Sequence, residues 1–252
     1  MKISKIFTAL SLLVTLCSST IFAEGVPALV SVNKAKPFVA ASVEADSKGS
    51  LTVQRKKGGP KQTFKYGQYE VVKVKMPANE FTKMNTAFKN KDYTTAASEA
   101  KRLFEKYKYL NQGGVPAQIW VDALLAGNKN NDAVSVCKTI KKFLNLEQRK
   151  AVYLAEARAY AALGKTKELA STFPTLVRFG GAAAAFVFNT QGTMAKDQGN
   201  NEDALLAYMK TFTMFTPEDT AVKPYREEAK KAIIAIFKEM GDNRAKTFVN
   251  EK

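Results

Sequence analysis

The sequence predicts a mainly α-helical fold with a small β part: an α-solenoid of antiparallel helix pairs, preceded by a small antiparallel β-sheet or partial barrel. Three observations predict it. Apolar residues alternate with a period of two up to about Met76, the period becomes that of helices from Asn79, and the helical part repeats a helix–turn–helix pattern. We therefore divide the chain into a leader (1–23), a β-module (24–78) and a helical repeat domain (79–252).

The leader is typical of a cleaved secretory signal peptide. Lys2 and Lys5 give it a cationic start, Ile6 to Leu16 form an apolar run too short to favour a spanning helix, and Ala23 is the small residue expected before a cleavage site. We expect cleavage before Glu24, export, and a soluble mature protein in the periplasm.

The mature chain is predicted to be basic and to hold one thiol. The full sequence has a net charge of +16, and loss of the two lysines of the leader leaves +14. Such a charge favours acidic partners. Cys17 leaves with the leader, so Cys137 has no internal disulfide partner, and we expect it to be buried as a small apolar residue.

The β-module predicts four or five short strands. Glycine-rich stretches mark the turns: Gly58-Gly59-Pro60 turns the chain once, and Gly67-Gln68 suits a two-residue hairpin with glycine first. The expected strands are Val26–Val32, Phe38–Val43, a segment around Leu51 and Val53, a segment around Phe64 and Tyr66, and Tyr69–Val74.

The last of these strands departs from clean alternation. Val71 and Val72 are adjacent, so the strand would carry apolar groups on both faces. We expect its second face to be covered, and the helical region that follows is the candidate. The β-module and the repeats should therefore pack together.

The helical region carries an internal repeat, in which each copy is a helix end, a Gly or Asn turn, and a new helix with an early alanine. Gly or Asn ends a helix by accepting a left-handed backbone conformation, and alanine lets two antiparallel helices approach closely. One helix pair cannot bury its apolar stripe alone, so stacked pairs share a core. We place the turns at Asn90, Gly127, Gly164, Gly199 and Gly241, and the alanines at Ala96, Ala133, Ala170 and Ala204.

Two segments of this region resemble the tetratricopeptide repeat signature: Trp120-x-x-Ala123-x-x-Ala126-Gly127 and Tyr160-x-x-Leu163-Gly164. The chain departs from the family at Lys167, where an aromatic residue is usual, in its longer periods, and in its missing prolines. With the leader and the β-module, the arrangement is similar to exported bacterial tetratricopeptide proteins of the envelope.

The resemblance implies that a protein or peptide partner binds in a groove lined by the first helix of each pair. Met84, Ala87 and Ala161 would also fall on this face. Some members of the family hold a peptide carboxylate by a cationic clamp, and the residues on this face do not reproduce that clamp. The partner-groove residues that it implies are Lys91, Val121, Leu124, Asn128, Arg158 and Lys165.

The composition argues against most enzyme classes. The chain has no histidine, which excludes imidazole-based triads and most transition-metal sites. It has neither a phosphate-binding GxxxxGK[ST] loop nor a CxxC pair, and its carboxylates fall among lysines on helices. We expect no catalytic residue, no cofactor and no metal, and so a protein that is not an enzyme.

The β-module is the most basic part of the mature chain, and its cations suggest an alternative function. Ten basic and four acidic residues give residues 24–78 a net charge of +6. Five cations with no acid among them surround one turn, where their fields should add. They form an acidic-partner patch: Arg55, Lys56, Lys57, Lys61 and Lys65.

Two hypotheses follow. The chain is an envelope scaffold that binds a protein through its repeats, or it binds a polyanion through the basic hairpin: a cell-wall polymer, an anionic lipid surface or a nucleic acid. Export argues against a nucleic acid, and we expect Phe64, Tyr66 and Tyr69 to fill the sheet core rather than to stack on bases. No feature of the sequence indicates an oligomeric state.

Overall fold

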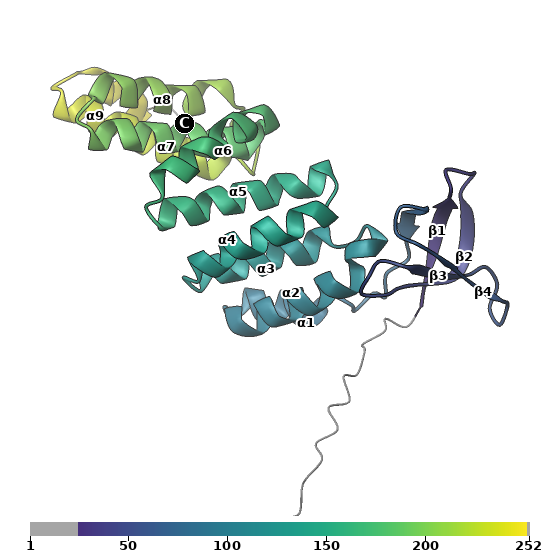
Figure 1. Cartoon of the computed structure of the whole chain (residues 1–252). Coiled ribbons are helices and arrows are strands. Elements are labelled where there is room, and N and C mark those ends of the chain that lie inside the picture. Colours follow the sequence, from purple (N-terminus) through teal and green to yellow (C-terminus); the bar gives the residue numbers. More distant parts are fainter. Residues whose placement is uncertain (1–24, 251–252) are drawn as a thin grey trace, which may run out of the picture.

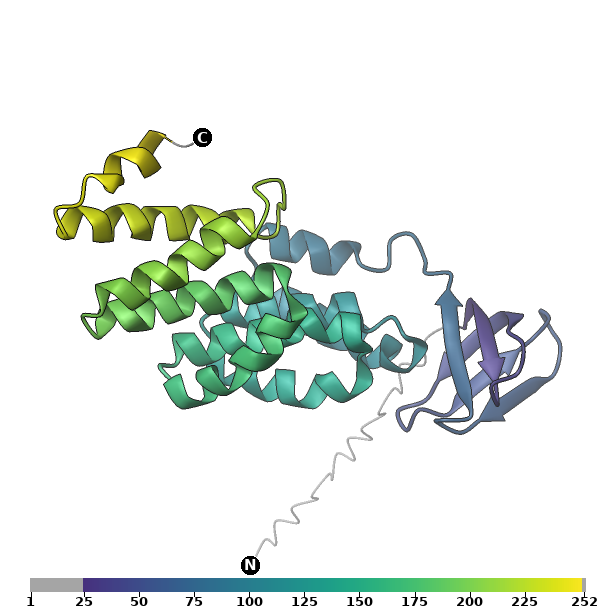
Figure 2. The ribbon, with the colours of Figure 1, turned by 90° about the horizontal axis from the view of Figure 1, so that it is seen from above.

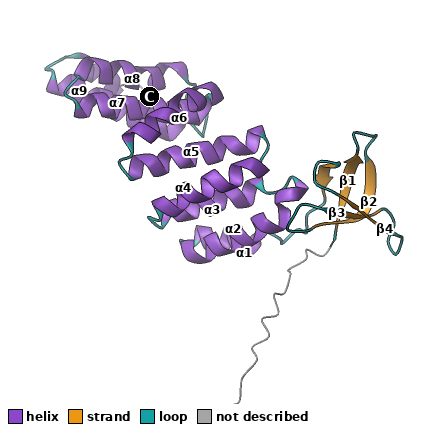
Figure 3. Cartoon of the chain, in the orientation of Figure 1, coloured by secondary structure: helices purple, strands orange, loops and turns teal. Residues whose placement is uncertain are grey.

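A computed structural model describes residues 25–250, so the predicted signal segment lies outside the described residues. Strands gather at one end of the molecule and helices form the rest (Figures 1 and 3). The predicted fold class is confirmed. The strands are β1 Val26–Val32, β2 Phe38–Ala45, β3 Leu51–Gln54, β4 Lys61–Phe64 and β5 Tyr69–Val74. The helices are α1 Thr82–Lys89, α2 Tyr93–Tyr107, α3 Gly114–Ala126, α4 Asn130–Ile140, α5 Leu146–Ala162, α6 Thr166–Phe179, α7 Gly181–Asp197, α8 Asn201–Met214, α9 Lys223–Glu239 and α10 Arg244–Asn250, with short 3₁₀ helices at Lys108–Leu110 and Lys141–Phe143.

The five strands form one antiparallel sheet in the order β4-β3-β2-β1-β5. The predicted hairpin at Gly67-Gln68 is wrong. Gly67 does adopt a positive φ of 88°, and the N–H of Gln68 bonds to the carbonyl of Lys65. However, the chain then crosses to the far edge of the sheet, where β5 pairs with β1. The turn chemistry was right, but pairing with β1 lets β5 bury Val71 and Val74 beside the first helices.

The adjacent valines of β5 mark a β-bulge. Leu29 pairs with Lys73 and Val30 pairs with Val71, which leaves Val72 as the extra residue between them. Val71 is buried, whereas Val72 is 45% exposed. The expectation that a covering layer hides both faces of this strand is therefore wrong, because the bulge turns Val72 outward.

The β-module nevertheless packs on the first helices. Apolar residues of the sheet, such as Val30 and Leu51, share one core with Met84, Leu103 and Tyr107 of α1 and α2. Buried apolar surface contributes about 25 cal/mol per Å², so a shared core of this kind holds the two parts together. The predicted contact between the β-module and the repeats is present.

Two tyrosines fasten the loop between β2 and β3 to this junction. The Tyr69 hydroxyl donates to the carbonyl of Gly49 at 2.7 Å, and the Tyr109 hydroxyl donates to the carbonyl of Ser47 at 3.4 Å. A Cβ at Gly49 would lie 2.8 Å from the Tyr109 ring. Glycine is required at this position for closeness as well as for its φ of 86°.

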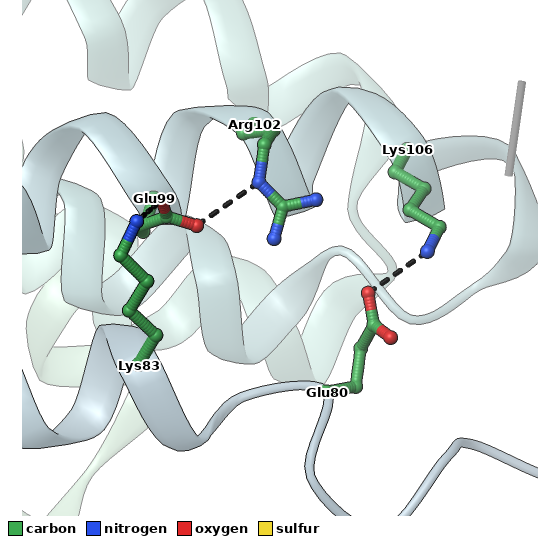
Figure 4. A network of polar contacts seen from close by, with 5 residues as sticks. All are labelled: Glu80, Lys83, Glu99, Arg102 and Lys106. Atoms are coloured by element: carbon green, nitrogen blue, oxygen red, sulfur yellow. Dashed lines mark hydrogen bonds and ion pairs between the residues drawn. The ribbon is translucent and has the colours of Figure 1, made fainter. Parts of the chain in front are cut away.

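Ion pairs hold the first helix of the array to the second (Figure 4). Lys83 on α1 and Arg102 on α2 both bond to the carboxylate of Glu99, at 2.6 and 3.0 Å. Lys106 on α2 reaches back to Glu80, just before α1, at 2.9 Å. These contacts fix the segment that joins the β-module to the repeats.

The helices form successive antiparallel pairs, and Figure 2 shows the array extending away from the sheet toward the C-terminus. Every pair closes with the same turn. In each turn a left-handed residue is followed by an N–H that bonds, at 2.8 to 3.0 Å, to the carbonyl five residues earlier. The left-handed residues are Lys91, Asn128, Gly164, Gly199 and Gly241, with φ between 58° and 77°.

The predicted turns are right in three copies and one residue early in two. Asn90 and Gly127 have φ of −79° and −86°, so the left-handed residue is the next one along the chain, Lys91 or Asn128. Counted from the left-handed residue, Ala204 falls in register with Ala96 and Ala133, and all three are fully buried.

The predicted alanine of the third copy, Ala170, is wrong because it was placed six residues after the turn, whereas the buried position is the fifth residue after the left-handed one. Leu169 lies five residues after its left-handed Gly164 and is buried, whereas Ala170 is exposed. This pair of helices therefore makes its close contact through a larger side chain.

Cys137 is buried, as predicted, in the core between α4 and α5. Burial, together with the nearby carboxylate of Glu156, raises the pKa of the Cys137 thiol to about 12. None of the helices within residues 25–250 is both long enough and apolar enough to cross a bilayer.

Candidate partner-binding groove

A hollow of about 600 Å³ opens between three helices that each begin a pair: α5, α7 and α9. This volume lies in the range of ligand-binding clefts. The lining is mostly apolar, with a few polar groups. The lining residues are Arg158, Ala161, Thr166, Leu169, Phe186, Asn189, Thr190, Thr193, Met194, Ala221, Pro224, Tyr225 and Glu228. We call this hollow the groove.

A chain of polar contacts crosses the groove from α5 to α9. Arg158 donates through a guanidinium nitrogen to the hydroxyl of Tyr225. The side-chain amide nitrogen of Asn189, on α7, donates to the backbone carbonyl of Tyr225 at 2.9 Å and to a carboxylate oxygen of Glu228 at 3.1 Å. Arg158 and Glu228 therefore lie at opposite ends of Tyr225.

Asn189 has an unpaired acceptor. The carbonyl of Tyr225 and the carboxylate of Glu228 can only accept hydrogen bonds. The amide nitrogen of Asn189 therefore faces them, and its Oδ1 points away from them. The residue is 3% exposed, and its Oδ1 has no hydrogen-bond partner among the described residues. A buried acceptor without a partner costs about 1–3 kcal/mol, and such groups call for a specific explanation.

Asp122 on α3 extends the polar line toward the β-module. Burial raises the pKa of its carboxyl, while the charge of Arg158 and a hydrogen bond from Gln118 lower it. Counted back from the left-handed residue of each turn, Asn85, Asp122, Arg158 and Thr193 all occupy the sixth position. One side chain from each of four successive repeats thus follows the same face of the array.

Of the six predicted groove residues, Arg158 lines the groove. Val121 is wrong because it is buried in the helical core, and Leu124, which is 7% exposed, borders a smaller hollow instead of this groove. They were chosen by counting from Gly127, and counting from Asn128 instead selects Asp122 and Leu125. In the first copy the same shift replaces the buried Met84 and Ala87 with Asn85 and Phe88.

The other three predicted groove residues lie at the turns. Lys91 and Asn128 are exposed left-handed residues, and Lys165 is exposed just before α6. Lys91 borders a smaller hollow of about 240 Å³, at the turns of the first two pairs. None of the three lines the groove between α5, α7 and α9.

Sequence reasoning missed Asn189, Tyr225 and Glu228. They come from two different helices, α7 and α9, and none of them falls at the position that was carried over from the family. Counting from Gly199 in the fourth repeat, as from Gly164 in the third, places Thr193 level with Arg158 and would have pointed to the α7 face that also carries Asn189.

The structure brings four of the five predicted patch cations together. Arg55, Lys56 and Lys57 lie in the β3–β4 turn, and Lys61 pairs across it with Gln54. Lys65 lies beyond the other end of β4, about 13 Å away at 3.3 Å per residue, so the prediction that it shares one turn with the other four is wrong. All five are exposed, and none forms an ion pair with a described residue.

The aromatic residues of the β-module divide between core and surface. Phe64 and Tyr69 pack partly against the sheet core, as predicted. Tyr66 is 63% exposed, so its assignment to the core is wrong. Its ring meets Tyr69 and Tyr109 edge to face, with centroids 6.5 and 5.4 Å apart. These rings cover the junction between the β-module and the helices.

A scan against models of protein families finds no match, and a search of curated proteins finds no similar sequence.

Proposed function

We propose that the chain is a non-enzymatic interaction scaffold of the bacterial cell envelope, built from divergent tetratricopeptide-like repeats, which binds a protein segment in the groove between α5, α7 and α9. The leader, which is typical of a signal peptide, supports export to the periplasm. The five identical turns support the relation to tetratricopeptide repeats.

One observation carries the proposal: the groove is lined mainly by the first helices of three successive pairs, with two residues of α6, and is mostly apolar with a few convergent polar groups. Apolar walls would bury the side chains of a bound segment, while Arg158, Asn189 and Glu228 would set its position. Helical repeats form extended binding surfaces in this way.

A filled groove tests the proposal. Ala161 is exposed and lines the groove, so Ala161→Trp would occupy the space of a ligand without disturbing the core. Ala162 is also exposed but does not line it, which makes Ala162→Trp the matched control. We expect partners captured from envelope extracts in 0.5 M salt to be lost with Ala161→Trp and kept with Ala162→Trp. Equal capture by both variants would remove the groove from consideration.

A second candidate function rests on the tip of the β3–β4 hairpin, where Arg55, Lys56, Lys57 and Lys61 project without an acidic partner. Like charges held together attract a polyanion, such as an anionic polymer or lipid surface. Such binding weakens steeply as salt rises.

Charge reversal tests this candidate. We expect binding of the mature chain to vesicles that contain anionic phospholipid, or to a polyanionic cell-wall polymer, to fall with salt and to be lost when the four tip cations become Glu. Reversal of four exposed lysines of the helical domain, Lys138, Lys167, Lys223 and Lys231, changes the net charge equally. If that control loses binding to the same extent, the tip is not a site.

A further inference from the structure

Two polar groups at the α9 end of the groove are hydrogen-bond acceptors with unused capacity, the carboxylate of Glu228 and the side-chain oxygen of Asn189. Glu228 is exposed at its rim, receives one bond from the amide of Asn189, and forms no ion pair with any residue between 25 and 250. The Oδ1 of Asn189 is buried beside it and unpaired. A carboxylate without a cationic partner and an amide oxygen without a donor favour a ligand that brings N–H groups and positive charge.

The cation of the groove, Arg158, lies at its other end, where it donates to the hydroxyl of Tyr225 and interacts with the charge of Asp122 on α3. The charge beside the unpaired oxygen of Asn189 is therefore the negative charge of Glu228. This sign is opposite to that of the whole protein, which has a net charge of +16.

We propose that the groove selects a peptide segment in which a basic side chain, Arg or Lys, is flanked by apolar residues: the apolar side chains pack on Phe186 and Met194, and the cation pairs with Glu228. This inference rests on the proposed function and narrows its ligand. A backbone or side-chain N–H of the same segment would reach Asn189 Oδ1 by a small rotation of that amide. Arginine suits the site best, because its several N–H groups can serve both acceptors at once.

General electrostatics predicts the opposite preference, which makes the proposal easy to test. A protein with this net charge attracts acidic peptides and repels basic ones. Selection of a basic peptide thus requires a local acidic site. Glu227 supplies the matched control, because it is the adjacent carboxylate on α9, is also exposed, and does not line the groove.

The experiment measures binding of the mature chain to five pools of nine-residue peptides. Each pool has leucine, valine and phenylalanine mixed at the flanking positions, and Arg, Lys, Gln, Glu or Leu fixed at the centre. Fluorescence anisotropy at 0.15 M salt gives the affinities of the wild type and of Glu228→Gln, Glu228→Lys, Glu227→Gln, Glu227→Lys and Ala161→Trp.

We expect the Arg pool to bind about tenfold more tightly than the Gln pool, the size expected of one partly shielded ion pair. Glu228→Gln should abolish that ratio, and Glu228→Lys should invert it in favour of the Glu pool. Both Glu227 variants should keep it.

Three results would overturn the inference. If all pools bind equally and Ala161→Trp still abolishes binding, the groove binds peptides without selecting charge, so the proposed function stands and this inference fails. If the Glu227 variants change the ratio as much as the Glu228 variants, the selection is not local. If no pool binds the wild type at 1 mM peptide, the groove as a peptide site fails as well.

Discussion

Gly192→Ala and Gly127→Ala are the same chemical change, and the structure predicts opposite effects on stability. Gly192 lies in the middle of α7, and a Cβ there would lie 2.7 to 2.8 Å from three atoms of the Tyr208 ring on α8. Tyr208 is 5% exposed, and its hydroxyl is hydrogen-bonded to Thr193 at 2.9 Å. The ring therefore has little freedom to move away.

Gly192→Ala has two opposing effects on the free energy of unfolding. Replacing glycine by alanine inside a helix stabilises by about 1 kcal/mol, whereas overpacking a close contact costs about 1–3 kcal/mol. Three ring contacts below 3.0 Å place this site toward the upper end of that range. We expect a net loss of about 1–2 kcal/mol, which lowers Tm by about 2–8 °C for a chain of this size.

Gly127 closes α3 with a φ of −86°, and no heavy atom would lie nearer than 3.2 Å to its added Cβ. Gly127→Ala should therefore stabilise by about 0.4–1 kcal/mol. Thermal unfolding of both variants measures the difference, and hydrogen exchange should show faster opening of α7 and α8 in Gly192→Ala. Tyr208→Leu should relieve the clash in the double variant. If Gly192→Ala raises Tm as Gly127→Ala does, the close packing of α7 on α8 is refuted.

Three further predictions follow from other contacts. Gly180 joins α6 to α7 at φ 69° and ψ −166°, a conformation confined almost to glycine, so Gly180→Ala should cost about 1–3 kcal/mol in urea unfolding; Gly164→Asn, at φ 65°, should change stability by only a few tenths. Hydrogen bonds from Lys83 and then Arg102 lower the pKa of Glu99 below its ordinary 4.5; the unfolded chain therefore binds more protons, and stability is present above pH 4.5 and lost as pH falls through the folded pKa. Glu99→Gln should cost about 1 kcal/mol at pH 7, and this cost should shrink as the pH falls below 4.5; a cost that does not shrink would contradict the ion pair. Glu105→Gln, which removes an exposed single ion pair, should have a smaller effect. Cys137 is buried with its pKa raised to about 12, so thiol reagents at pH 8 should label it only at the rate of unfolding, and rapid labelling of the folded protein would show that it is accessible.

The helical periodicity and the turn residues were enough to predict the fold class, because each repeat is specified by local chemistry. The register within a repeat was harder. Lys91 adopts the left-handed conformation in the first copy, directly after Asn90, which is the residue that propensity favours there. The N–H of Asp92 bonds to the carbonyl of Ala87 and closes the turn around Lys91. This bond cannot be inferred from the residue type at any single position.

The one-residue error then carried into the predicted site. Because of this error, the groove residue expected in the second repeat was Val121, which is buried. The correct choice is Asp122, which occupies the same position in its repeat as Arg158. The groove itself could not be predicted, because Asn189 and Glu228 meet only through the stacking of α7 on α9. In the β-module, likewise, Gly67 indicated a turn but not the strand with which β5 would pair.

The tyrosine bonds that fasten the loop between β2 and β3 have a consequence for partners that could engage both ends of the molecule. Tyr69 holds this loop within the β-module, while the bond from Tyr109 and the core shared with α1 and α2 tie the module to the helices, so the span between the hairpin tip and the groove varies little. A ligand long enough to bridge that span would bind its second site at a high effective concentration. A shorter ligand would have no such advantage, whatever its affinity for either site alone. The molecule would then select partners by their length as well as by their chemistry.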